Sequence, residues 1–105
     1  MRYVAKNGTV LDPERSERKW DEGTRWDGRN HISLATASQW EHEVLHLGRS
    51  GVWWIEHWSQ WQGSTPSGRV VSARDACRWL LANDYDPDGE DFPDELAEFV
   101  DQLIA

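Results

Sequence analysis

The sequence lacks the features that define several large classes of protein. It has no apolar run of membrane-spanning length, and its opening MRYVAKNGTV has no signal-peptide core, so we expect a soluble, cytoplasmic protein. Its one cysteine, Cys77, excludes an internal disulfide and suits a reducing compartment. Lys and Arg (11) are fewer than Asp and Glu (19), and the resulting net charge of −8 argues against direct binding to nucleic acid or anionic lipid.

Aliphatic residues are also scarce. Leu, Ile, Val and Phe number 20 of 105, a composition close to that of disordered chains. Eight tryptophans compensate, because each indole can bury about 150–250 Å². We therefore expect one folded domain over residues 1–105.

Short strands dominate the first part of the predicted fold. Asn7-Gly8 favours a two-residue type I′ turn in a hairpin over residues 3–11. The polar stretch that follows is broken by Pro and Gly, and we expect a loop there with a short strand near Lys19 or Trp26. Residues 1–62 are accordingly predicted to be mainly β.

The clearest hairpin lies within residues 41–61. The segment GRSG predicts a three-residue turn with Gly51 in the left-handed conformation. Pairing across this turn places Leu47 opposite Trp53 and Glu43 opposite His57. The two faces of the paired strands then differ in character, which indicates an antiparallel sheet with one face covered.

Two helices are predicted in residues 72–105, with an acidic loop over 84–95 between them. Ser72 can cap the first helix, Asn83 can end it, and Pro93 suits the start of the second. Strands first and helices last favour the α+β class. We expect a small antiparallel sheet of four or five strands, followed by two C-terminal helices packed on it.

The sequence HEVLH resembles the HExxH signature of zinc metallopeptidases over five residues. On a helix, His42 and His46 would bind zinc, Glu43 would activate water, and Glu56 or His57 could supply a third ligand. The same residues fit a strand, in which the two histidines would lie roughly 13 Å apart. A zinc hydrolase is therefore an alternative, and we expect a protein that is not an enzyme.

The acidic loop resembles the twelve-residue calcium loop of EF-hand proteins. Asp occupies the first, third and fifth positions, Gly the sixth and Glu the twelfth. The pattern is broken by Asp91 and Pro93, and the chain has no second such loop. Calcium binding is thus a second alternative, and no other cofactor is expected. The ligands would be Asp84, Asp86, Asp88, Glu90 and Glu95.

The uneven charge distribution and the tryptophans of the predicted sheet together suggest a binding protein. Residues 1–83 carry a net charge of +1, whereas residues 84–105 hold nine acidic residues and no basic one. Such a row of carboxylates can dock on a cationic surface of a protein partner. Strand alternation cannot bury both Trp53 and Trp54 on one face, so the sheet can also offer exposed indoles.

The leading hypothesis is a small acidic regulatory protein that binds a protein partner through its acidic C-terminal helix and its Trp-rich sheet surface. One version is an inhibitor of a nucleic-acid-handling complex by charge mimicry. The residues expected to contact the partner are Trp54, Trp58, Trp61, Asp94, Glu98 and Asp101.

Overall fold

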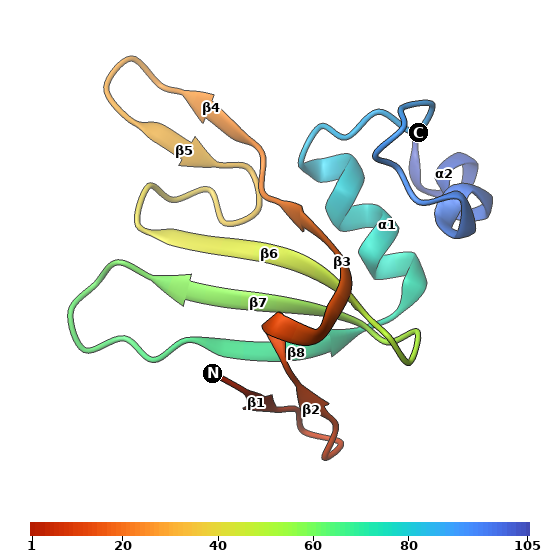
Figure 1. Ribbon diagram of the computed structural model, residues 1–105. Helices are drawn as coiled ribbons and strands as arrows, with labels where there is room; N and C mark the ends of the chain where they lie inside the picture. The colour runs from red at the N-terminus through yellow and green to blue at the C-terminus, as the bar shows by residue number, and fades with distance from the viewer.

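The computed structural model describes residues 1–105 and has the predicted α+β architecture. Four antiparallel strands form the main sheet in the order β3-β6-β7-β8, and two further pairs, β1–β2 and β4–β5, are separate from it (Figure 1). The strands are β1 (Tyr3–Val4), β2 (Val10–Leu11), β3 (Ser16–Asp21), β4 (Thr24–Trp26), β5 (His31–Ser33), β6 (Glu41–Gly48), β7 (Trp53–Ser59) and β8 (Ser67–Val71). The helices are α1 (Ala73–Ala82) and α2 (Ala97–Leu103), with single 3-10 turns η1 (Pro13–Arg15) and η2 (Asp94–Leu96).

The central hairpin of β6 and β7 has the predicted register. Leu47 lies opposite Trp53 and Glu43 lies opposite His57. The turn is closed by the N–H of Gly48, which donates to the carbonyl of Val52 at 2.9 Å. Gly51 has a φ of 86°, the left-handed conformation that this three-residue turn requires.

The first hairpin, β1–β2, forms where predicted but with a different turn. Only Gly8 has a positive φ (87°), so Asn7 does not take the second left-handed position of a type I′ turn. The N–H of Ala5 donates to Thr9, and the N–H of Gly8 donates back to Ala5. The loop therefore has three residues, like the β6–β7 turn, and needs one left-handed residue rather than two.

The main core lies between one face of the sheet and the two helices. Trp20, Leu45, Trp53 and Ile55 project from the sheet, and the stripe of α1 and the buried side chains before α2 pack against them. Trp20 and Trp53 lie with ring centroids 5.5 Å apart. The buried residues contributed by the C-terminal part are Ala76, Cys77, Trp79, Leu80, Phe92 and Leu96.

A smaller core covers part of the opposite face of the sheet. Ala5 and Leu11 of the N-terminal hairpin pack on Trp54, with Tyr3 at the edge. Gly68 of β8 permits this close approach, since a Cβ there would lie 3.0 Å from the Tyr3 ring. The sheet is thus covered by helices on one side and by the β1–β2 hairpin on the other (Figure 1).

The helical part begins and ends where the sequence indicates. The Ser72 hydroxyl accepts a hydrogen bond from the N–H of Asp75, and Asn83 forms the C-cap of α1. Pro93 precedes a 3-10 turn that continues into α2. None of the helices is long and apolar enough to cross a lipid bilayer.

Candidate functional site

The HExxH segment lies in strand β6, not in a helix. His42 pairs across the hairpin with Trp58, and His46 pairs with Trp54. Each histidine has its own carboxylate: His42 Nδ1 lies 2.7 Å from Glu22, and His46 Nε2 lies 3.1 Å from Glu56. No group of three His, Cys, Asp or Glu side chains converges as metal ligands. The predicted alternative of a helical zinc site is therefore wrong, because strand geometry separates the two histidines.

Glu43 forms a buried polar junction on the helix-covered face. Glu43 is 6% exposed, and its carboxylate accepts hydrogen bonds from Trp79 Nε1 and Arg69, both at 3.1 Å. His57 Nδ1 lies 3.2 Å from the same carboxylate. These partners come from α1, β8 and β7, so Glu43 joins three elements through buried polar contacts.

A second polar chain lies on the opposite face, around His46. This imidazole is 2% exposed and stacks on Trp54, with centroids 4.1 Å apart and planes 10° from parallel. Its Nδ1 is 2.6 Å from the hydroxyl of Ser16, and the other oxygen of Glu56 accepts from Tyr3 at 2.7 Å. Because an ionised Glu56 can only accept, Nε2 carries the hydrogen and Nδ1 accepts from Ser16.

Burial sets the protonation of this chain. It lowers the pKa of His46, a shift that the hydrogen bond to Glu56 opposes. Burial and the Glu56 contact raise the pKa of Tyr3 to about 12. Ser16, His46 and Glu56 are the residue types of a Ser-His-acid catalytic relay. Ser16, however, does not line the nearest cavity, which is described next. The chain therefore ties the N-terminal hairpin to the sheet.

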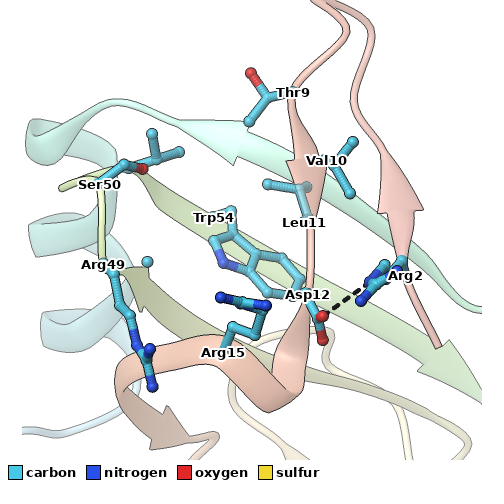
Figure 2. A pocket seen from close by; sticks show the side chains of 11 residues that line it. Arg2, Thr9, Val10, Leu11, Asp12, Arg15, Arg49, Ser50 and Trp54 are labelled. Carbon is cyan, nitrogen blue, oxygen red and sulfur yellow. Dashed lines mark hydrogen bonds and ion pairs between the residues drawn. The ribbon is translucent and has the colours of Figure 1, made fainter.

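That cavity has a volume of about 400 Å³ and opens between the N-terminal hairpin and the β6–β7 turn (Figure 2). Its apolar lining comprises the accessible Val10 and the half-buried Val52, together with Trp54 and Leu11, which are each only 2% exposed. Three arginines and a single acidic residue line it, although the protein as a whole carries a charge of −8. The charged lining residues are Arg2, Arg15, Arg49 and Asp12.

The tryptophans expected to bind a partner have three different environments. Trp54 is buried beneath the N-terminal hairpin, so its predicted place on an exposed surface is wrong. Trp58 is half-buried and lies 5.6 Å from the His42 ring. Trp61 is 59% exposed and pairs with Trp40, with ring centroids 5.1 Å apart.

The acidic residues of the C-terminal part are exposed and almost free of cationic partners. All nine are exposed, and only Glu95 approaches a cation, at 3.9 Å from Arg18. In residues 1–83, by contrast, six of ten acidic residues lie within 4.0 Å of an Arg or His nitrogen. The predicted contact residues Asp94, Glu98 and Asp101 belong to the unpaired set.

The predicted calcium loop does not assemble a ligand shell. Gly89 does not take a left-handed conformation, and one oxygen of Asp86 accepts the N–H of Asp88. The end of the loop is held against the core, because Phe92 is buried and the carbonyl of Asp91 accepts from Trp20 at 2.6 Å. The predicted ligands Asp84, Asp86, Asp88, Glu90 and Glu95 do not form a cluster of three or more in this structure, and calcium binding by this loop stays a prediction.

The acidic segment and the exposed indole pair lie at different ends of the main sheet. In Figure 1 the start of β6 and the end of β7 lie on the left, whereas α2 lies on the right. Trp40 directly precedes β6 and Trp61 follows β7. One small contact therefore cannot include both features.

Comparison with known proteins gives no match, whether to a family model, a curated protein or a solved structure.

Proposed function

We propose that this protein is a small, non-enzymatic binding protein whose exposed C-terminal carboxylates dock on a cationic surface of a protein partner. The observation that carries the proposal is the contrast in pairing: one of nine acidic residues near the C-terminus lies within 4.0 Å of an arginine, whereas elsewhere three of ten lie beside an arginine and three more lie beside a histidine. Unpaired like charges repel one another and lower stability. A cationic partner relieves that repulsion.

Asp94, Glu98 and Asp101 are the centre of the proposed contact. They are exposed, and they belong to η2 and α2, whose apolar residues pack toward the core. The exposed Trp61 lies at the far end of the sheet and is left out of this contact. A surface that ordinarily binds nucleic acid is the concrete partner we propose, because carboxylate rows offer it the charge of phosphates. A cytoplasmic location is part of the proposal and rests on the single cysteine.

The test is affinity capture from an extract of the native host at two ionic strengths. Proteins held at about 0.05 M salt and released at about 0.5 M are the candidates, since screening shortens the reach of exposed charges. The decisive comparison uses a D94N/E98Q/D101N variant and a matched E14Q/E17Q/D21N variant. The matched set removes the same charge from exposed residues outside the acidic segment that have no cationic partner.

The proposal predicts capture by the wild type and by the matched variant, and loss of capture by D94N/E98Q/D101N. Added double-stranded DNA should release the captured protein if its docking surface also binds nucleic acid. Equal capture by all three proteins, or no salt-sensitive capture, would contradict the proposed function.

A further inference from the structure

The cavity between the N-terminal hairpin and the β6–β7 turn has the opposite charge to the rest of the molecule. Its lining contains three arginines and one aspartate, a net charge of +2, in a chain of net charge −8. The contributing residues are distant in sequence, so only folding brings them together. A cationic hollow in an acidic protein is a place where a small anion is attracted locally.

Two of the arginines have no partner within the protein. Arg2 is held by Asp12, whose Oδ2 lies 2.9 Å from its Nε. The other oxygen of Asp12 accepts the N–H of Glu14 at the start of η1, so both oxygens of this carboxylate are engaged. Neither Arg15 nor Arg49 lies within 4.0 Å of any carboxylate. Their guanidinium groups can therefore bind an anion with charge-assisted hydrogen bonds.

The apolar part of the cavity lining indicates the kind of anion. Figure 2 shows the Arg15 guanidinium next to the indole of Trp54, with Arg2 on one side and Arg49, which extends away from the indole, on the other. Val10 and the half-buried Val52 give the cavity accessible aliphatic surface. Sites for small organic molecules combine apolar surface with convergent polar groups, and about 400 Å³ is within their usual range. A fully hydrated inorganic ion would leave this aliphatic surface unused.

We propose that this cavity binds a small organic anion, with one phosphate or carboxylate group joined to a compact aromatic or branched aliphatic body. The anionic group is held by Arg15 and Arg49, and the apolar body contacts Val10 and Val52, above the buried Trp54. This site is separate from the acidic segment, so it can be present whether or not that segment binds a protein.

The test is an NMR titration of the ¹⁵N-labelled protein with phenyl phosphate, observing the arginine Nε–H and tryptophan indole signals. Benzoate tests the carboxylate form of the ligand, inorganic phosphate tests the anion alone, and phenol tests the ring alone. Saturable shifts at Arg15, Arg49 and Trp54 are expected with phenyl phosphate or benzoate. Inorganic phosphate and phenol should bind at least about tenfold more weakly, because each lacks one part of the recognition.

Substitution separates this site from general charge attraction. R15A and R49A should each weaken binding about tenfold or more, since each removes a charge-assisted hydrogen bond. Both side chains are exposed, so the fold is expected to survive. R25A is the matched control: Arg25 is an exposed arginine of β4 that forms no ion pair and does not line the cavity.

Three outcomes would overturn the proposal. The first is no saturable shift with either organic anion. The second is equal binding of phenol or inorganic phosphate. The third is an equal loss of affinity in R25A. None of these results bears on capture by the acidic segment, which uses other residues.

Discussion

Trp53 and Trp54 are consecutive in the chain but are buried in two different cores. Trp53 packs under the helices against Trp20, whereas Trp54 lies under the N-terminal hairpin and stacks on His46. Strand alternation requires this division, because neighbouring side chains point to opposite faces. The indole expected at the surface is thus as buried as its neighbour.

Replacing Trp54 should be far more damaging than replacing Trp61. W54A removes a side chain that is 2% exposed and should lower the free energy of unfolding by about 3–5 kcal/mol. W61A removes a ring that is 59% exposed and should change it by no more than about 0.5 kcal/mol. Urea unfolding of both variants measures the difference. Equal losses would contradict the burial of Trp54.

His46 makes stability depend on pH in a defined direction. Burial lowers its pKa below the ordinary value of 6.5, so the unfolded chain takes up its proton at a higher pH than the folded protein does. Stability from this residue is therefore full above pH 6.5 and decreases as the pH falls from 6.5 toward the folded pKa. Urea unfolding between about pH 7.5 and 5.5 should show this decrease. The slope should be smaller in H46Q, and an unchanged slope would contradict the assignment.

At the scale of elements, local patterns predicted more than distant contacts. The β6–β7 register followed from alternating side chains and one turn glycine, and the α1 boundaries followed from Ser72 and Asn83. The packing of the N-terminal hairpin over Trp54 could not be predicted from local patterns, because its contact between Tyr3 and Glu56 joins residues 53 positions apart in the sequence. Contacts of that kind depend on tertiary packing, for which the hairpin's own residues give no periodic signal.

The turn of the central hairpin offers a test of its geometry. A Cβ at Gly51 would meet nothing within 4 Å, so the cost of a side chain there comes only from its φ of 86°. G51A should lower the free energy of unfolding by about 1–2 kcal/mol. G51N should cost less, because Asn tolerates the left-handed conformation. Thermal or urea unfolding of the two variants measures whether G51A is less stable than G51N. Equal stability of G51A and the wild type would contradict the left-handed conformation of Gly51 in this turn.

At the scale of the whole molecule, charge is divided between two places. The cavity lined by Arg2, Arg15 and Arg49 is cationic, whereas the C-terminal carboxylates are exposed and, apart from Glu95, unpaired. The sequence indicated the second place, because nine acidic residues occur together in the chain. It did not indicate the first, because the three arginines come from separate elements. Composition thus predicted a charged segment and missed a charged cavity.

The most direct test of the central claim is the salt dependence of the affinity for the captured partner. Titration calorimetry from about 0.05 to 0.5 M salt should show affinity falling steeply with salt for the wild type and the E14Q/E17Q/D21N control. D94N/E98Q/D101N should bind at least about tenfold more weakly at low salt and with a shallower salt dependence. An affinity that does not change with salt, or that is equal for the two triple variants, would contradict recognition through the C-terminal carboxylates.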